Sequence, residues 1–263
     1  MKKIIYLVCF ATLFLSSCSS DSSQSTAAED DVLVKEVWTD NDTNPIHFNY
    51  DGKKFVSTNY DGEDRYYTYT GDLITKIQTY NNGNGLGYGL RVESLFTYDT
   101  SGRLTEHVFK SIPDANNIDY TITTTFVYNS NNTISVVKTI GYPTLAFSYV
   151  PETRLIHLSG TTIISEDTSV YNTTGGFEYG YTTSYNYDTK NNPFKNVIGY
   201  KEIYLAEDYV FCFDHLSYLH NIVASDEITV TYTYNSLNFP VTAATTSVSE
   251  PQIPPSMTHY IYY

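Results

Sequence analysis

Apolar and polar residues alternate along most of this chain with a repeat of two. Around residue 96, Phe96 and Tyr98 would fall on one face of a strand. Leu95 and Thr97 would fall on the opposite face. A repeat of two is the spacing of a half-buried β-strand. The pattern therefore predicts an all-β chain, and a content of 27 tyrosines agrees with it because tyrosine suits a pleated surface.

One short unit recurs seven times: an aromatic residue, any residue, and then a tyrosine. The seven copies are Phe48-x-Tyr50, Tyr67-x-Tyr69, Phe96-x-Tyr98, Phe126-x-Tyr128, Phe147-x-Tyr149, Tyr185-x-Tyr187 and Tyr232-x-Tyr234. Most copies lead into turn residues, as at 99–102, 129–132, 188–192 and 235–238. Asp and Asn bond their own backbone there, and Gly and Asn tolerate a positive φ. The unit therefore predicts β-hairpins with loops of about four to five residues.

The spacing of the units is irregular, since successive tyrosines lie 19 to 47 residues apart. Two strands and a tight turn need roughly 20 residues. We therefore expect a long twisted antiparallel sheet built from repeated hairpins, rather than a strict solenoid. The longer intervals would hold a loop at residues 81–87 and one short helical insertion near 201–219, where apolar residues recur at helical spacing. Residues 259–263 would form a last strand that closes or edges the sheet.

The amino terminus has the features of a targeting segment. Lys2 and Lys3 precede an apolar stretch, residues 4–15, that is too short for a stable membrane anchor. The sequence Leu-Ser-Ser-Cys that ends at Cys18 resembles the lipobox of bacterial lipoproteins, in which the cysteine is lipidated. The alternative is an ordinary secretory signal with an incidental cysteine. We expect a signal peptide at 1–17, a lipidated Cys18 with a disordered tether at 18–31, and one β domain at 32–263.

The lipobox resemblance implies a lipid-anchored protein of the outer membrane, on its periplasmic or its outer face. The formal net charge is −14, and it becomes −16 once residues 1–17 are removed. An acidic protein gains no electrostatic attraction to anionic lipid, so the lipid on Cys18 would supply the membrane contact. The same charge disfavours nucleic acid as a partner, because phosphates need clusters of Lys and Arg.

Part of the chain resembles the YD repeat of RHS proteins. The stretch Tyr-Asp-Thr-Ser-Gly-Arg-Leu-Thr at 98–105 matches that unit best, and Tyr-Asp at 187–188 is similar. Together with Cys18, the stretch Asn-Asn-Pro-Phe-Lys-Asn-Val at 191–197 resembles uncharacterised Bacteroidetes lipoproteins with YD-like repeats. The resemblance spans about residues 48–263. It implies an all-β envelope protein and no particular activity, and the repeats are too few to build the closed shell of large RHS proteins.

Oxygen ligands at alternate positions, Asp40, Asp42 and Asn44, are similar to the opening of a calcium loop. Pro45 stands where such a loop has its turn glycine. We therefore interpret the segment as an ordinary loop rich in Asp and Asn. We expect neither a metal nor another cofactor.

Catalytic motifs do not stand out. The chain holds neither a G-x-S-x-G nucleophile motif nor a phosphate-binding loop. Acidic pairs such as Glu166-Asp167 are adjacent in sequence and would face opposite sides of a strand. Cys212 lies in an apolar stretch, and we interpret it as a small buried residue rather than a nucleophile.

These observations favour a non-catalytic envelope lipoprotein that binds or scaffolds an envelope protein or a glycan. Its aromatic sheet surface would make the contact. The alternative is a surface lipoprotein that binds carbohydrate or cleaves it as glycosidases do. A groove with two convergent carboxylates about 5 to 10 Å apart would favour the enzyme.

Overall fold

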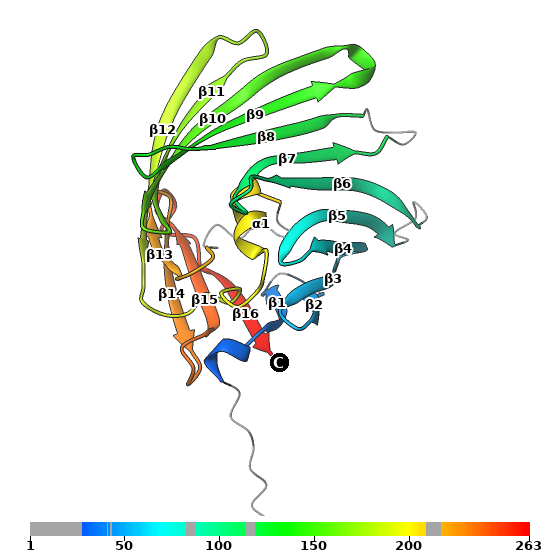
Figure 1. Ribbon diagram of the computed structural model, residues 1–263. Coiled ribbons are helices and arrows are strands. Elements are labelled where there is room, and N and C mark those ends of the chain that lie inside the picture. The colour runs from blue at the N-terminus through cyan, green and yellow to red at the C-terminus, as the bar shows by residue number, and fades with distance from the viewer. Residues whose placement is uncertain (1–27, 41, 43, 83–87, 114–118, 209–216) are drawn as a thin grey trace, which may run out of the picture.

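The computed structural model describes residues 28–263 except 41, 43, 83–87, 114–118 and 209–216. Within these residues, sixteen antiparallel strands follow one another around a closed barrel (Figure 1). The strands are β1 Val34–Thr39, β2 Ile46–Asp51, β3 Lys54–Tyr60, β4 Glu63–Thr70, β5 Leu73–Asn82, β6 Tyr88–Tyr98, β7 Leu104–Ser111, β8 Thr121–Tyr128, β9 Thr133–Tyr142, β10 Phe147–Ser159, β11 Thr162–Tyr171, β12 Phe177–Tyr187, β13 Ile222–Ser225, β14 Ile228–Tyr234, β15 Pro240–Ser247 and β16 Ser256–Tyr262. Short 3-10 helices occupy Glu29–Asp31 (η1) and Pro143–Leu145 (η2).

The first and last strands pair with each other, and this pairing closes the barrel. Val34 lies opposite Tyr262, and Val37 lies opposite Tyr260. The prediction of an antiparallel all-β fold is confirmed, but the predicted long twisted sheet is wrong, because the strands form a closed barrel. An open sheet would leave the backbone N–H and C=O groups of β1 and β16 unpaired, and closure satisfies them. The predicted carboxy-terminal strand is β16, and it is the strand that closes the barrel.

The tyrosine of the repeated unit sits where the strand register shifts. Shifts of this kind occur at Tyr50, Tyr69, Tyr98, Tyr187 and Tyr234. Several inner-face tyrosines also donate a hydrogen bond to the carbonyl at the start of a nearby strand: Tyr50 to Val34 at 2.8 Å, Tyr98 to Ile74 at 2.7 Å, and Tyr232 to Ile222 at 2.8 Å. The tyrosines therefore fix hairpin register from inside the barrel.

One copy of the unit does not precede a turn. Phe147 and Tyr149 begin β10, which continues without interruption to Ser159. The register shifts between Tyr149 and Glu152, so the segment around Pro151 forms an irregularity within the strand rather than a loop. A bulge accommodates a proline, which lacks an N–H to donate. The hairpin predicted after Tyr149 is therefore wrong.

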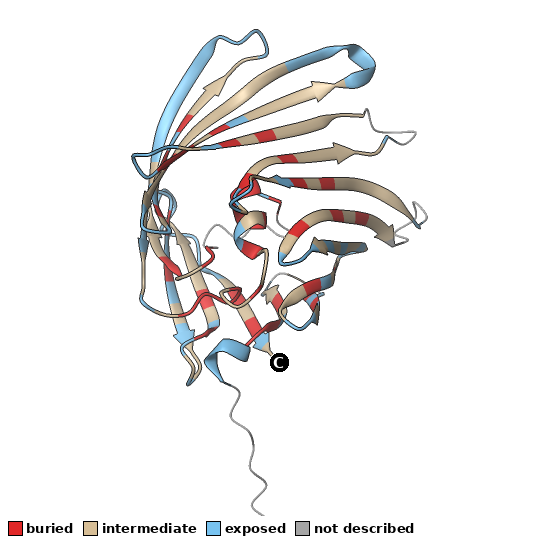
Figure 2. Ribbon diagram, in the orientation of Figure 1, coloured by how far each residue is buried: buried red, intermediate tan, exposed pale blue. Residues whose placement is uncertain are grey.

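The chain between β12 and β13 folds into the lumen. We call the described parts of residues 188–221 the inner segment. Its Phe194 stacks on Tyr200 with ring centroids 4.3 Å apart and lies 5.4 Å from Phe48 and 6.4 Å from Phe55. All four rings are buried, and they form the centre of the hydrophobic core. Figure 2 shows buried positions gathered around the inner segment, while the outer parts of β10 and β12 are exposed.

The inner segment contains the one helix of more than three residues in the described chain, α1 Tyr200–Ala206. Five of its seven residues are buried. Gly199 precedes it with a φ of 86°, and a Cβ there would lie 3.1 Å from the Tyr69 ring. The helix predicted near 201–219 is thus confirmed at its start and is shorter than expected. Part of the remaining prediction, including Cys212, lies outside the described residues.

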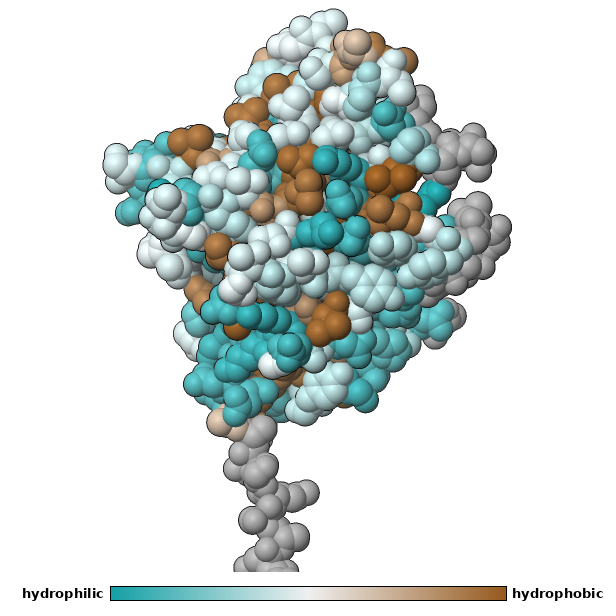
Figure 3. All heavy atoms as spheres, turned by 45° about the vertical axis from the view of Figure 1, so that its right-hand side comes forward, coloured by the Kyte–Doolittle hydropathy of each residue, from teal (hydrophilic) through white to brown (hydrophobic). Residues whose placement is uncertain are grey.

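The barrel encloses an apolar core, and its outer face is mostly polar. Outward positions include Thr229, Thr231 and Thr233 on β14, and Asp167 and Ser169 on β11. On the face shown in Figure 3, apolar residues form separate patches among polar ones. Among the described residues, no helix has the length and hydropathy to cross a membrane.

The two ends of the barrel differ. At the end that holds the inner segment, inner-face residues such as Phe48 and Ile74 are almost fully buried. We call this the closed end. At the opposite end, the inner-face residues Phe147, Tyr179 and Tyr181 are 41%, 55% and 47% exposed. We call this the open end.

The role of the tyrosines in register predicts the effect of removing one hydroxyl. Tyr98→Phe keeps the ring and deletes the hydrogen bond to the Ile74 carbonyl. We expect the free energy of unfolding in urea to fall by about 1 kcal/mol, the usual net contribution of such a bond. Tyr179→Phe, at an exposed ring of the open end, is the control and should change little. Equal effects of the two variants would contradict this role.

Candidate binding site in the barrel lumen

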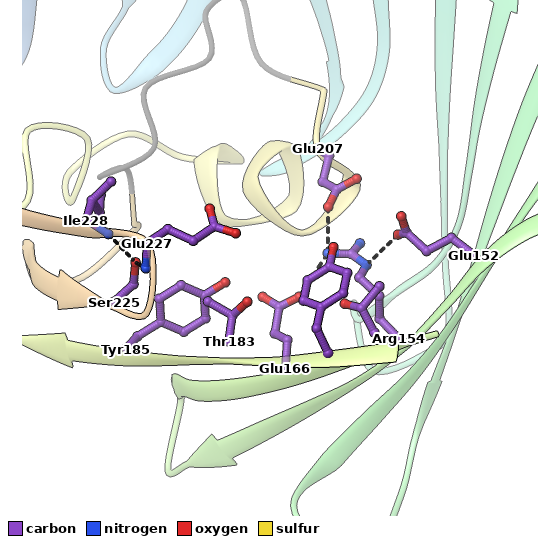
Figure 4. A pocket seen from close by; sticks show the side chains of 11 residues that line it. Glu152, Arg154, Glu166, Thr183, Tyr185, Glu207, Ser225, Glu227 and Ile228 are labelled. Atoms are coloured by element: carbon purple, nitrogen blue, oxygen red, sulfur yellow. Dashed lines mark hydrogen bonds and ion pairs between the residues drawn. The ribbon is translucent and has the colours of Figure 1, made fainter. Parts of the chain in front are cut away.

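A polar cavity of about 220 Å³ opens on the inner wall of β10, β11 and β12 (Figure 4). The wall contributes Glu152, Arg154, Glu166, Thr168, Thr183 and Tyr185, together with Tyr181. The end of α1 contributes Glu207, and the β13–β14 turn contributes Ser225, Glu227 and Ile228. The cavity thus lies between the inner segment and the wall of the barrel.

Strand alternation brings these wall residues together. Arg154 lies opposite Thr168, and Thr168 lies opposite Tyr181. Glu166 lies opposite Thr183 in the same sheet. Because alternate residues face one side of a strand, all of these side chains point into the lumen.

Arg154 is the centre of an ion-pair network. Its Nη1 lies 3.0 Å from Glu166 and 2.6 Å from Glu207, and its Nε lies 3.3 Å from Glu152. Lys138 Nζ lies 3.0 Å from Glu207 and 3.7 Å from Glu152. Two cations therefore hold three carboxylates. The network also ties the end of α1 to the strands, because Glu207 follows the last helical residue.

The pKa values of two carboxyl groups in the network are shifted in opposite directions. Burial raises the pKa of Glu166 above its usual range, and the charge of Arg154 opposes this effect only in part. Burial also opposes ionisation of Glu207, but Arg154 and Lys138 lower its pKa below the usual range. Two carboxyl groups around one guanidinium therefore differ in acidity.

A second buried cluster follows at the next residue of the chain. Asp208 accepts from Arg65 Nη1 at 3.1 Å and lies 3.0 Å from His107 Nε2. Burial alone would raise the pKa of Asp208. The hydrogen bond from His107 and the charge of Arg65 outweigh burial, and the pKa lies below its usual range. The cluster joins the end of α1 to β4 and β7. We interpret it as an anchor for the inner segment.

Aromatic rings line the lumen at the open end. One continuous row of rings crosses from β7 to β10, with successive ring centroids 5.8 to 6.5 Å apart. It consists of Phe109 on β7, Tyr120 just before β8, Tyr142 on β9, and Phe147 and Tyr149 on β10. On β12, Tyr179 and Tyr181 lie 6.3 Å apart. Their exposure shows that water reaches the lumen here.

The three residues that are similar to the opening of a calcium loop, Asp40, Asp42 and Asn44, lie outside this cavity. Asp40 contacts His259 Nε2 at 2.6 Å, and Asp42 accepts from the Thr39 N–H at 2.9 Å. Asn44 is exposed, and positions 41 and 43 lie outside the described residues. In the part of the chain that the structure describes, no group of three or more His, Cys, Asp or Glu side chains is placed to hold a metal.

The lipidation residue predicted from the sequence, Cys18, lies outside the described residues. The residues of the lumenal cavity were not predicted. Two of them could be recognised from the sequence. Glu152 and Arg154 lie four and two residues before Ile156, which is buried, so all three face the same side of the strand. Alternation therefore marks them as inward-facing charges, but the hairpin predicted after Tyr149 would place them in or beside its loop.

The fold and the cavity define a class: an up-and-down β-barrel with one end closed by an inner segment and a charged cavity open from the other. The barrel is similar to a porin-like protein from Bacteroides vulgatus, with a TM-score of 0.57 at 13% identity over 89% of this chain and 99% of that one. Weaker matches are a porin-like protein from Bacteroides uniformis (TM-score 0.33, 12% identity, 88% and 96% covered) and a protein of unknown function from Bacteroides fragilis (TM-score 0.36, 12% identity, 45% and 90% covered).

At this level of identity the similarity concerns the fold alone. No family model matches the chain, and no curated protein matches it. The cavity must therefore be interpreted from its own residues.

Proposed function

We propose that this protein is a non-catalytic binding protein of the cell envelope that takes a small ligand into its lumen through the open end. The observation that carries the proposal is the polar cavity beside Arg154, whose charged wall is held in place by ion pairs. Such fixed polar groups in a concave site are typical of ligand-binding pockets. The exposed rings of Tyr179 and Tyr181 mark the approach to it from solvent.

Binding fits the interior of the barrel better than conduction. Phe48, Phe55 and Phe194 pack together inside the closed end. Channel-forming barrels of the outer membrane keep a polar, water-filled interior. In the described part of this chain, the same space holds the hydrophobic core. A ligand that enters from the open end would therefore stop at the cavity.

With a lipid on Cys18, the position of η1 would orient the barrel relative to the membrane. Lys195 of the inner segment contacts Glu29 at 2.8 Å, and Asn196 donates to the Glu29 carbonyl at 2.8 Å. The chain before β1 thus leaves from the closed end. Nine residues lie between Cys18 and Ala28, and the ten steps of chain reach about 35 Å at most. The closed end would face the membrane and the open end would face away.

A carbohydrate-handling enzyme is the second candidate, and one observation favours it. Glu166 and Glu207 converge on the same nitrogen of Arg154 and have pKa values shifted in opposite directions. Glycosidases use two carboxyl groups of unequal acidity. Both groups here are engaged by Arg154, which is the arrangement of a structural network. We therefore place binding first.

The binding proposal predicts that filling the cavity abolishes ligand retention. The lipid-free Cys18→Ala chain is incubated with the small-molecule fraction of native cell envelopes, and compounds that co-elute with the protein are identified by mass spectrometry. We expect retained compounds with this chain and none after a further Thr183→Trp change, because the indole would occupy the cavity. Thr231→Trp, on the outer face of β14, is the matched control and should retain them.

Circular dichroism of both tryptophan variants checks that the barrel is folded. No retained compound, or equal retention by the two variants, would contradict a lumenal binding site. New products formed by the parent chain but not by a Glu166→Gln variant would favour the enzyme instead.

The anchoring proposal is tested in cells of a bacterium that processes lipoproteins. We expect the wild-type protein in the membrane fraction and Cys18→Ala in the soluble fraction, because the polar outer face gives the barrel no other attachment. Fractionation of Cys18→Ala with membranes would contradict lipid anchoring.

A further inference from the structure

The charges of the cavity do not balance. Four carboxylates line it, from Glu152, Glu166, Glu207 and Glu227, against the single guanidinium of Arg154. Lys138 adds a second cation through its contacts with Glu152 and Glu207. Four acidic groups and two basic groups leave a formal charge of −2. The chain as a whole has the same sign, at −14, so the field of the protein attracts cations to this lumen.

Glu227 accounts for much of the imbalance. Among the described contacts, the carboxylate of Glu227 forms neither an ion pair nor a hydrogen bond, whereas the other three acids of the cavity contact Arg154. Figure 4 shows this carboxylate directed into the space above Tyr185 and toward Glu166. Glu227 comes from the β13–β14 turn and faces the wall strands across the cavity. An ionised acceptor therefore borders an open, accessible volume.

The remaining lining suits an organic cation. Tyr181 and Tyr185 contribute aromatic rings, and Thr183 contributes a hydroxyl group that accepts hydrogen bonds. Carboxylates and aromatic rings together are the groups that recognise ammonium and guanidinium ions. The volume of about 220 Å³ admits a chain of several heavy atoms and not a folded partner. An anion would meet the excess of carboxylates.

We propose that the ligand of this cavity carries a positively charged amine or guanidinium group, which binds between the Glu227 carboxylate and the rings of Tyr181 and Tyr185. This inference deepens the proposed function and rests on it, because it assigns a chemical class to the ligand of the same cavity. The Arg154 network then serves as a fixed wall. Glu227 supplies the one carboxylate of the lining that is outside the Arg154 network and available to a ligand.

Agmatine, which has an amine at one end and a guanidinium at the other, is a direct probe. Isothermal titration of the lipid-free Cys18→Ala chain at low ionic strength should detect saturable binding. We expect Glu227→Gln to weaken it about tenfold, because the substitution removes the charge and keeps the shape. High salt should weaken binding as well. Butane-1,4-diol, an uncharged chain of similar length, should not bind.

Glu250→Gln is the matched control, since Glu250 lies in the exposed turn before β16, at the same end of the barrel, and does not line the cavity. The Glu250→Gln variant should bind agmatine with the same affinity as the parent chain. Absence of agmatine binding, or equal losses in the Glu227 and Glu250 variants, would overturn the cation assignment. If envelope compounds are still retained and Thr183→Trp still abolishes their retention, the binding function stands and only the ligand class fails. If retention is absent too, both proposals fail.

Discussion

The packing of Phe194 against Phe48, Phe55 and Tyr200 is the contact on which the rest of this structure depends. A barrel with this many strands has a lumen too wide for its own inward side chains to fill. An empty apolar lumen would forfeit the contacts that stabilise a core. The inner segment supplies the missing volume, and the buried rings around it join both sides of the barrel into one core.

This arrangement also produces the site. Since the inner segment fills only the closed end, the lumen beyond α1 remains accessible to water. The two residues after the helix, Glu207 and Asp208, carry carboxylates from the core into this polar region. Each meets a cation on the wall, Arg154 for Glu207 and Arg65 for Asp208. The same ion pairs that hold the inner segment in place therefore shape one side of the cavity.

The local structure could be predicted from the sequence, and the closure could not. Phe96 and Tyr98 indicate a hairpin through alternation and the turn that follows, and the structure confirms it. The same local pattern fits an open meander and a closed barrel equally well. The difference rests on the pairing of Val34 with Tyr262, which lie at opposite ends of the chain. The hairpin predicted after Tyr149 is absent because the irregularity around Pro151 lies inside a strand, and its conformation depends on the neighbouring strands.

The cavity could not be predicted from the sequence, for a similar reason. Its residues run from Glu152 to Glu227, and they come together only because a barrel wall and an inner segment face each other. The unequal carboxyl groups of the site likewise depend on burial beside Arg154. The sequence shows only that Glu152 and Arg154 alternate in step with the buried Ile156. It identifies inward charges on a strand, but it does not identify the partners that those charges meet.

The central claim is that the inner segment forms the core of the barrel, and a pair of truncations tests it directly. Phe194→Ala removes a fully buried ring at the centre of the lumen, while Phe177→Ala removes a ring that is 63% exposed at the open end. Urea unfolding should show a loss of about 3 to 5 kcal/mol for Phe194→Ala and a far smaller loss for Phe177→Ala. Similar losses for both variants, or none for Phe194→Ala, would show that the barrel stands without its inner segment and would contradict this account.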